Sequence, residues 1–239
     1  ADHRCLTHQQ KKIFRDWLRR SAAGEPVQYI TGETEFFGLP FTLTGDVLIP
    51  RPETERLVEI AINEANESKE FSVLDIGTGC GSIAVSLACS LKEISVTATD
   101  NNRNALKVAQ LNAKKNGVAS RIQFIDHDIL NDEVENCFDI IVSNPPYVPL
   151  KEYKALQDNV RCFEPREALT EDADGLTFYR SFAAKGKNWL REGGVMILEV
   201  GCGKHPLHAK ELFESAGWTE VELSNDYNGD PRVLKAKRP

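Results

Sequence analysis

The strongest constraint in this sequence is a repeated alternation of short apolar strands with helices between Ser72 and Ala236. The expected strands are Ser72–Ile76, Ile94–Thr99, Arg121–Ile125, Asp139–Ser143, Val195–Val200, Glu220–Ser224 and Arg232–Ala236, and the expected helices are Ser82–Leu91, Arg103–Asn116, Phe178–Leu190 and Leu207–Ala216. Strands separated by helices are joined by right-handed crossovers, which produce a mostly parallel sheet covered on both faces. The last two strands lie too close for a crossover helix, so they should pair antiparallel. The sequence therefore predicts an α/β fold with a seven-stranded sheet.

Charge and hydropathy exclude two broad classes of protein. The 239 residues contain 29 Lys and Arg against 36 Asp and Glu, a net charge of −7. No global positive field is available to hold a long phosphate backbone, which disfavours a general nucleic-acid coat protein. No apolar run approaches the roughly 18 residues that a spanning helix needs, so we expect no membrane association.

The cysteines indicate a reducing compartment. All six are scattered without a C-x-x-C pair, at Cys5, Cys80, Cys89, Cys137, Cys162 and Cys202. In a chain of this length, that pattern is typical of free thiols rather than of a disulfide or zinc framework. We therefore expect a cytoplasmic protein without a metal site.

The first 33 residues are expected to form a helical appendage to the main domain. Thr7 and Gln10 make a capping box, the apolar Ile13, Phe14, Trp17 and Leu18 share one helical face, and Gly24 and Pro26 end the helix. The basic side chains on the opposite face are expected to be solvated. Residues 34–49 suggest a β-hairpin at the start of a main domain that spans 34–239, and Pro52 suits the first position of a further helix, 53–66.

A glycine-rich loop follows the first expected strand of the sheet. Asp75-Ile76-Gly77-Thr78-Gly79-Cys80-Gly81 leads directly into a helix, where open α/β sheets bind their ligands. The helix start offers free N–H groups and the positive end of its dipole. Asp100 closes the second strand 19 residues after Gly81, where an acid can accept hydrogen bonds from both ribose hydroxyls. A nucleoside ligand is the favoured interpretation, and a tight turn without a ligand is the alternative.

The loop spacing also narrows the kind of nucleoside. It is G-x-G-x-G rather than the dinucleotide G-x-G-x-x-G, and it is similar to that of class I S-adenosylmethionine-dependent methyltransferases, which have a Rossmann-like fold. Past the third strand, Asp128 can reach an adenine amino group and Ile129 can pack against the purine. A local capping role for Asp128 is the alternative.

The segment Asn144-Pro145-Pro146-Tyr147 stands at the carboxyl end of the fourth strand. Two prolines fix the backbone and remove two N–H donors, so the segment presents carbonyl oxygens beside the acceptor oxygen of Asn144. Such an acceptor pair can hold a planar –NH2 group by both hydrogens, and Tyr147 can pack against its flat face. Aligning a weakly nucleophilic amide nitrogen on a methyl donor is a positioning strategy that needs no general base. The alternative is a proline-rich turn that only ends a strand.

Further motifs extend this pattern over nearly the whole chain. They are Gly24-Glu25-Pro26-Val27-Gln28-Tyr29-Ile30-Thr31-Gly32, Leu48-Ile49-Pro50-Arg51-Pro52-Glu53-Thr54-Glu55, Glu164-Pro165 through Ala168-Leu169, Asp174-Gly175-Leu176, Glu199-Val200-Gly201, and Asp226 with Gly229 and Arg232. Together with Asn-Pro-Pro-Tyr they resemble the HemK/PrmC family, the protein-(glutamine-N5) methyltransferases of peptide-chain release factors. The sequence departs from that family in its short N-terminal part, in Glu171–Ala173 where glycines are usual, and in Lys204 where a glutamine is usual.

The resemblance implies a substrate, a cofactor and a set of site residues. The substrate would be the Gly-Gly-Gln glutamine of a class-1 release factor, gripped by Asn144, Pro145, Pro146 and Tyr147, with Asn144, Pro145 and Tyr147 as catalytic residues. S-adenosylmethionine would be held by Gly77, Thr78, Gly79, Cys80, Gly81, Asp100, Asp128, Ile129 and Asn144. The N-terminal appendage would be the remnant of a larger substrate-docking domain. We expect a monomer that makes no direct contact with nucleic acid.

Three other functions compete with this interpretation. A methyltransferase acting on adenine N6, cytosine N4 or guanine N2 could use the same acceptor pair, but the acidic charge balance and the lack of a large recognition insert argue against it. A non-catalytic nucleoside-binding module is disfavoured by the intact Asn-Pro-Pro-Tyr segment. A nicotinamide-dependent oxidoreductase is disfavoured by the loop spacing.

Overall fold

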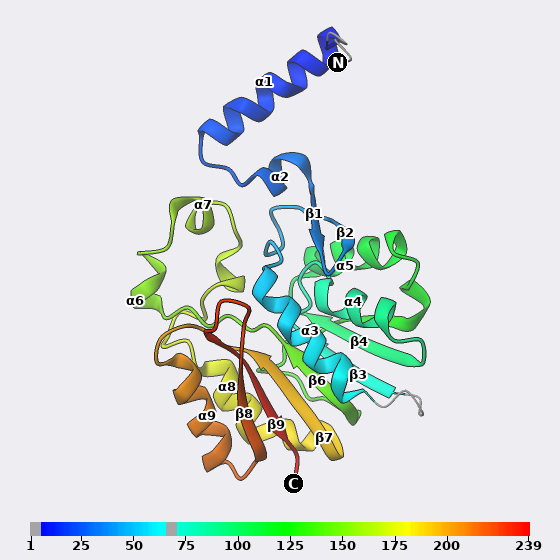
Figure 1. Cartoon of the computed structure of the whole chain (residues 1–239), viewed down its shortest axis with the longest axis vertical. Coiled ribbons are helices and arrows are strands. Elements are labelled where there is room, and N and C mark those ends of the chain that lie inside the picture. Colours follow the sequence, from blue (N-terminus) through cyan, green and yellow to red (C-terminus); the bar gives the residue numbers. More distant parts are fainter. Residues whose placement is uncertain (1–5, 66–70) are drawn as a thin grey trace.

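A seven-stranded sheet forms the centre of the protein (Figure 1). The computed structural model describes residues 6–65 and 71–239, and its strand order is β5-β4-β3-β6-β7-β9-β8. The strands are β3 (Phe71–Ile76), β4 (Ile94–Asp100), β5 (Ile122–Asp126), β6 (Phe138–Ser143), β7 (Leu190–Glu199), β8 (Thr219–Asn225) and β9 (Pro231–Lys237). Strands β3 to β7 pair in parallel, whereas β9 is antiparallel to both β7 and β8. The predicted mostly parallel sheet with an antiparallel last pair is confirmed.

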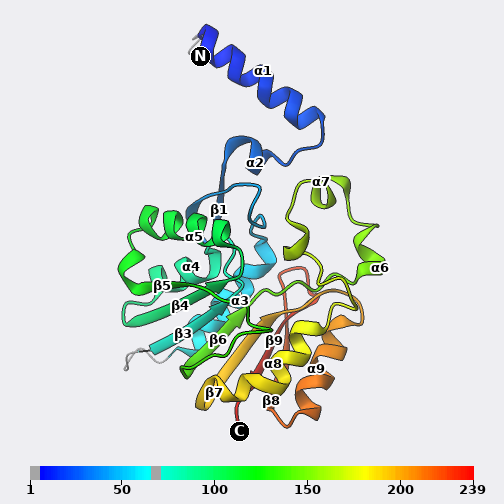
Figure 2. The same cartoon turned by 180° about the vertical axis from the view of Figure 1, so that it is seen from behind.

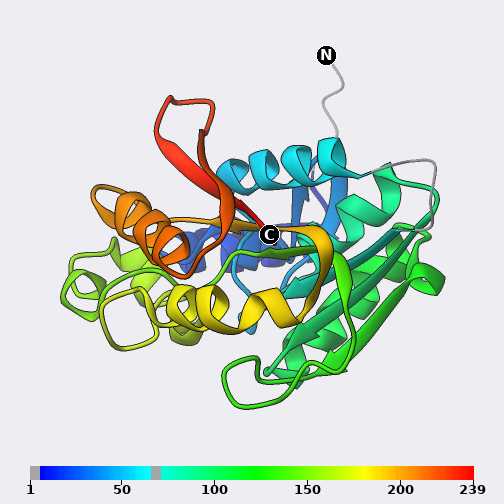
Figure 3. The same ribbon diagram turned by 90° about the horizontal axis from the view of Figure 1, so that it is seen from below.

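Helices cover both faces of this sheet (Figures 2 and 3). One layer contains α3 (Pro52–Glu64), α4 (Ser82–Ser90) and α5 (Arg103–Lys115), and the other contains α8 (Thr177–Lys185) and α9 (His205–Ser215). Each layer encloses its own apolar core, with Leu57 and Ile83 in the first and Tyr179 and Phe213 in the second. Because the chain leaves β3 toward β4 on one side and returns to β6 on the other, the carboxyl end of β3 is a switch point, where such sheets bind ligands.

Two predicted boundaries between β6 and β7 were wrong. The helix expected over Phe178–Leu190 ends at Lys185, and β7 starts at Leu190 rather than at Val195. Leu190 pairs with Phe138 at the start of β6 and is fully buried, so sheet pairing overrides the helical periodicity there. A short 3-10 turn, η3 (Gly186–Asn188), separates the two elements.

The segment after Asn-Pro-Pro-Tyr, for which no helix or strand was predicted, contains short helical elements. It contains the short helices α6 (Leu150–Tyr153) and α7 (Asp158–Arg161) and the 3-10 turn η2 (Arg166–Ala168).

No helix among residues 6–65 and 71–239 is long and apolar enough to cross a membrane.

The N-terminal helix α1 (His8–Ala22) projects away from the sheet (Figure 1). Its predicted capping box is present, with Gln10 donating its N–H to the Thr7 hydroxyl at 3.2 Å. The apolar side chains of Ile13, Phe14 and Leu18 are 42–53% exposed. The assignment of 1–33 as a separate unit stays a prediction.

A short helix and a hairpin connect α1 to the main domain. Helix α2 (Val27–Thr31) forms where no element was expected, and the predicted hairpin comprises β1 (Glu33–Phe36) and β2 (Leu39–Thr42). The turn residues Phe37 and Gly38 both have positive φ, as in the primed turns that suit hairpin twist.

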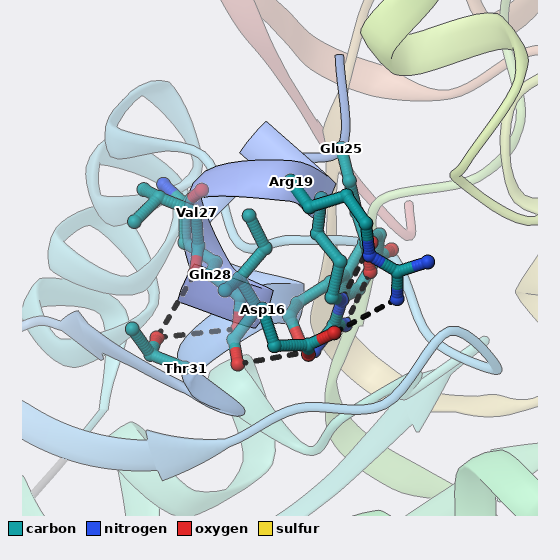
Figure 4. A network of polar contacts seen from close by, with 9 residues as sticks. Asp16, Arg19, Glu25, Val27, Gln28 and Thr31 are labelled. Atoms are coloured by element: carbon teal, nitrogen blue, oxygen red, sulfur yellow. Dashed lines mark hydrogen bonds and ion pairs between the residues drawn. The ribbon is translucent and has the colours of Figure 1, made fainter. Parts of the chain in front are cut away.

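Polar contacts fix the junction between α1 and α2 (Figure 4). Arg20 donates to the Glu25 carboxylate at 2.7 Å and to the Tyr29 carbonyl at 3.1 Å. The Thr31 hydroxyl donates back to the Val27 carbonyl at 3.0 Å (Figure 4). The Gly-Glu-Pro-Val-Gln-Tyr-Ile-Thr-Gly motif is therefore a structural joint between the appendage and the hairpin.

The buried Asn112 side chain ties the hairpin to the main domain. Its Oδ1 accepts the Thr42 N–H at 2.7 Å, and its Nδ2 donates to the carbonyls of Thr42 and Cys80 at 3.0 and 2.9 Å. One side chain on α5 thus satisfies backbone groups of both β2 and the glycine loop.

We predict that Asn112→Ala lowers the free energy of unfolding by about 1–3 kcal/mol, because it leaves buried backbone groups without partners. Gln110→Ala, at an exposed position of the same helix, should change it by less than about 0.5 kcal/mol. Denaturant unfolding of the three proteins measures both effects. Equal midpoints for Asn112→Ala and Gln110→Ala would contradict the assignment.

Candidate functional site

One cavity opens at the carboxyl ends of β3, β4 and β6. Its lining brings together residues from the glycine loop, the ends of β4 and β5, the Asn-Pro-Pro segment and the region before α3: among them Asp46, Pro50, Thr54, Gly77, Thr78, Gly79, Cys80, Asp100, Asp128, Ile129, Asn144, Pro145, Pro146, Glu167 and Phe178. The lining includes all the predicted site residues except Gly81 and Tyr147. Among the described residues, no cluster of three or more His, Cys, Asp or Glu side chains is arranged to hold a metal ion.

The glycine loop leaves its inner side open to this cavity. Gly77 and Gly79 have φ of +70° and +56°, and a Cβ built on either would meet no atom within 4 Å. Gly81 serves packing instead, because a Cβ there would lie 3.1 Å from the Cβ of Ala109 on α5. The loop therefore combines a ligand-accessible backbone with a close contact between α4 and α5.

The buried carboxyl of Asp75 holds the loop in shape. Its Oδ2 accepts from the Thr78 hydroxyl at 2.7 Å and from the Ala84 N–H at 3.2 Å. Burial raises the pKa of Asp75 to about 7 despite these hydrogen bonds. Asp75, which precedes the glycines, thus stabilises the loop through these hydrogen bonds and does not itself line the cavity.

Asp100 stands at the end of β4 with its side chain at the cavity. Its Oδ2 accepts the Gly79 N–H and its Oδ1 accepts the Asn102 N–H, both at 2.9 Å. Burial raises its pKa. Each carboxylate oxygen retains accepting capacity, so the carboxylate can brace the loop and also accept from a ligand. Its contact with ribose hydroxyls stays a prediction.

Asp128 makes local hydrogen bonds and also lines the cavity. Its oxygens accept from the Leu130 N–H at 3.1 Å and the Asn131 side-chain amide at 2.8 Å, which is a local cap. It also lines the cavity beside Ile129, which is 4% exposed. A purine-binding role for this pair stays a prediction.

The Asn-Pro-Pro-Tyr segment is divided between the cavity and the core behind it. Asn144, Pro145 and Pro146 line the cavity, but Tyr147 does not. The Tyr147 ring packs with the core under α8 and α9, and its hydroxyl donates to Glu199 Oε1 at 3.1 Å. In this structure the Tyr147 side chain supports the segment from the interior, and its packing against the substrate amide stays a prediction.

Glu199, for which no role was predicted, lies behind this segment at the end of β7. The side chain is 1% exposed, and the Thr54 hydroxyl donates to its Oε2 at 2.5 Å. Burial raises the pKa of Glu199 to about 7. Thr54 and Glu199 both belong to motifs singled out in the sequence, Pro-Arg-Pro-Glu-Thr-Glu and Glu-Val-Gly. Only the fold shows that the two side chains are in contact.

An ion pair between the partly exposed Arg51 and the buried Glu164 connects two segments that contribute residues to the cavity lining. Arg51 donates to Glu164 Oε1 at 2.5 Å, and the Ile49 N–H lies 3.4 Å from Glu164 Oε2. Glu164 is 6% exposed, and its neighbour Pro165 lines the cavity, as does Pro50 beside Arg51. The motifs around Arg51 and Glu164 therefore join across the site.

Comparisons with known proteins agree on the fold and the family. The family described as "Methyltransferase small domain" matches residues 55–162, and the "PrmC N-terminal domain" matches residues 1–32. A methyltransferase from Pyrococcus furiosus has a TM-score of 0.62 at 18% identity, covering 98% of this chain and 99% of that one. The hMettl16 catalytic domain, in complex with an RNA hairpin, has a TM-score of 0.67 at 18% identity, covering 85% and 77%. Both likenesses show the fold alone.

Curated relatives are more similar in sequence. The release factor glutamine methyltransferase of Chlorobaculum tepidum is 41% identical over 98% of this chain and 82% of its own length. The protein of the same name from Flavobacterium psychrophilum is 45% identical over 88% of this chain and 75% of its own. The chain therefore belongs to the release factor glutamine methyltransferase family.

Proposed function

We propose that this protein transfers a methyl group from S-adenosylmethionine to the side-chain amide nitrogen, N5, of the Gly-Gly-Gln glutamine in class-1 peptide-chain release factors. The observation that carries the proposal is the shared cavity. The acceptor segment of Asn144, Pro145 and Pro146 faces the same space as the glycine loop and Asp100. Membership of the family supplies the identity of the protein substrate.

The residues present fit S-adenosylmethionine. The open inner side of Gly77 and Gly79 is a cradle that any Cβ would fill, and Asp100 beside it has capacity to accept from ribose hydroxyls. We assign Gly77, Thr78, Gly79, Cys80, Asp100, Asp128, Ile129 and Asn144 to the cofactor side of the cavity, and Gly81 to the packing that supports it. When bound, S-adenosylmethionine supplies a methyl group on a positively charged sulfur, and the electron pair of the broken carbon–sulfur bond stays with that sulfur.

The task of the protein is then to orient a poor nucleophile. The amide nitrogen has its lone pair delocalised into the carbonyl, so alignment and hydrogen-bond acceptance carry the catalysis. Asn144 Oδ1 and the Pro145 carbonyl accept the two amide hydrogens and direct the nitrogen toward the methyl group. Once the new carbon–nitrogen bond has formed, the nitrogen releases one of these protons to water, which leaves a neutral N-methyl amide. Tyr147 supports the segment from behind.

Methylation of a nucleic-acid base is the alternative and is not favoured. The RNA-bound hMettl16 domain is only 18% identical, whereas the relatives at 41% and 45% identity are release factor glutamine methyltransferases. A monomeric state, the absence of nucleic-acid contact and a cytoplasmic location remain predictions.

The decisive experiment offers the enzyme and labelled S-adenosylmethionine three substrates. They are an intact class-1 release factor, the same factor with its Gly-Gly-Gln glutamine changed to alanine, and a mixed DNA and RNA pool. We predict label on the first alone, placed on the glutamine by mass spectrometry. Label on nucleic acid, or equal label on the alanine variant, would refute the proposed function.

Two glycines give the Asn-Pro-Pro-Tyr segment its position. A Cβ at Gly175 would lie 2.4 Å from the Tyr147 carbonyl oxygen, and one at Gly201 would lie 3.1 Å from the Tyr147 ring. The His205 ring completes this packing: its Nε2 lies 2.8 Å from the Gly175 carbonyl, and its Nδ1 accepts the Gly201 N–H. The Asp-Gly-Leu and Glu-Val-Gly motifs thus hold the segment from behind.

We predict that Gly175→Ala lowers single-turnover methyl transfer more than tenfold at saturating cofactor, because the new methyl group displaces the backbone at Tyr147. Gly193→Ala is the matched control. Its φ of +73° imposes the same left-handed strain, about 1–2 kcal/mol, but its Cβ would meet nothing within 4 Å. Calorimetric titration with S-adenosylmethionine should give similar affinities for both variants. Equal rates in the two variants would show that the close contact at Gly175 does not position the Asn-Pro-Pro-Tyr segment for catalysis.

A further inference from the structure

A chain of hydrogen bonds runs from the cavity wall into the core. The Asn144 amide Nδ2 donates to the Thr54 hydroxyl oxygen at 3.2 Å. That hydroxyl in turn donates to Glu199 Oε2 at 2.5 Å. Asn144 and Thr54 both line the cavity, although Thr54 is only 3% exposed, whereas Glu199 is 1% exposed and does not line it. The chain therefore connects the acceptor segment to an acid that no substrate can reach.

The order of donors in this chain is determined by chemistry. An ionised carboxylate only accepts, so the single proton of the Thr54 hydroxyl points to Glu199. The hydroxyl oxygen then offers only lone pairs to Asn144, and the amide can satisfy it only with Nδ2. The Asn144 Oδ1 is consequently turned away from Thr54. This is the orientation in which the side chain can accept an N–H.

We propose that Glu199, acting through Thr54, is a positioning residue that fixes the polarity of the Asn144 amide and thereby makes the site select an –NH2 donor. This inference rests on the proposed function. If the amide were reversed, Nδ2 would face the incoming glutamine and oppose its –NH2 group donor to donor. The energetic preference for the correct orientation originates in the buried acid.

The groups around Glu199 act on its ionised form in opposite directions. The Tyr147 hydroxyl donates to Oε1 at 3.1 Å, and the Tyr179 hydroxyl donates to the main-chain carbonyl of the same residue. Burial raises the pKa of Glu199 to about 7, although the hydrogen bonds from Thr54 and Tyr147 and the charge of Arg232 lower it. The nearby charge of Glu53 adds to the rise. Burial raises the pKa of both tyrosines further above neutrality, so neither titrates near pH 7.

The orientation of the Asn144 amide should therefore depend on pH, because it depends on whether Glu199 is ionised. Protonated Glu199 can donate to Thr54, which frees the Thr54 proton to turn toward Asn144 and accommodates the reversed amide. Because the raised pKa leaves the acid protonated below about 7, methyl transfer at saturating cofactor should rise as pH increases through about 7. Asp75 has a similar pKa, so the wild-type profile must be compared with a variant that lacks the chain but keeps Asp75.

Two substitutions of Thr54 distinguish the effect of its hydroxyl on the Asn144 orientation from the effect of its packing. Thr54→Val keeps the branched shape and removes the hydroxyl, whereas Thr54→Ser keeps the hydroxyl and removes a methyl group. We predict a single-turnover rate about ten- to a hundredfold lower for Thr54→Val, the range for a lost hydrogen bond to a charged group. Thr54→Ser should stay within about threefold of the wild type. The affinity for S-adenosylmethionine should change little in either variant.

The rise of activity through about pH 7 should disappear in Thr54→Val and persist in Thr54→Ser. Glu199→Gln provides an independent test, since it should also slow methyl transfer. The double variant with Thr54→Val should be no slower than the slower of the two single variants, because both residues act through one chain of hydrogen bonds. A larger loss in Thr54→Ser than in Thr54→Val would assign Thr54 to packing and overturn the inference alone. If the wild type itself fails to methylate a release factor, the proposed function fails and the inference with it.

Discussion

A carboxylate buried at the end of a central strand has to be satisfied by donors, and at Glu199 those donors come from two distant segments. Thr54 belongs to the first turn of α3, and Tyr147 belongs to the segment that follows β6. Removing either donor would leave a buried acid under-paired, which costs more than a surface hydrogen bond. The acid therefore holds together the parts of the chain that must meet for the site to exist. Asn144 enters the same arrangement through Thr54.

The sheet topology supplies the other half of the site. Because β3 lies between β4 and β6, the glycine loop, Asp100 and Asn144 emerge along one edge although they are far apart in sequence. Asp75 shapes the loop from below, and Asp100 braces it through the Gly79 N–H. On the side of the cavity that we propose for the cofactor, acids hold the glycine loop in place. On the side that we propose for the substrate, an acid acts through the hydroxyl of Thr54.

The sequence was sufficient for features governed by local pattern and known spacing. The alternation of apolar strands with helices predicted the mostly parallel sheet and its antiparallel last pair. The glycine spacing predicted the ligand-binding loop, and the motifs predicted the family. It failed where tertiary contacts decide. Leu190 reads as the end of a helix but is drawn into β7 by pairing with Phe138. The place of Tyr147 behind the cavity depends on Gly175 and Gly201, which only the fold brings next to it. The link from Thr54 to Glu199 spans 145 positions and has no local signature.

We propose that the site binds a primary amide by both of its hydrogens. A crystal structure of the protein with S-adenosylhomocysteine and a Gly-Gly-Gln peptide would test this. We expect the glutamine side-chain nitrogen to lie about 3 Å from both Asn144 Oδ1 and the Pro145 carbonyl oxygen, with the Asn144 Nδ2 still donating to Thr54. A glutamine whose amide oxygen faces Asn144, or one bound away from Asn144 and Pro145, would contradict it.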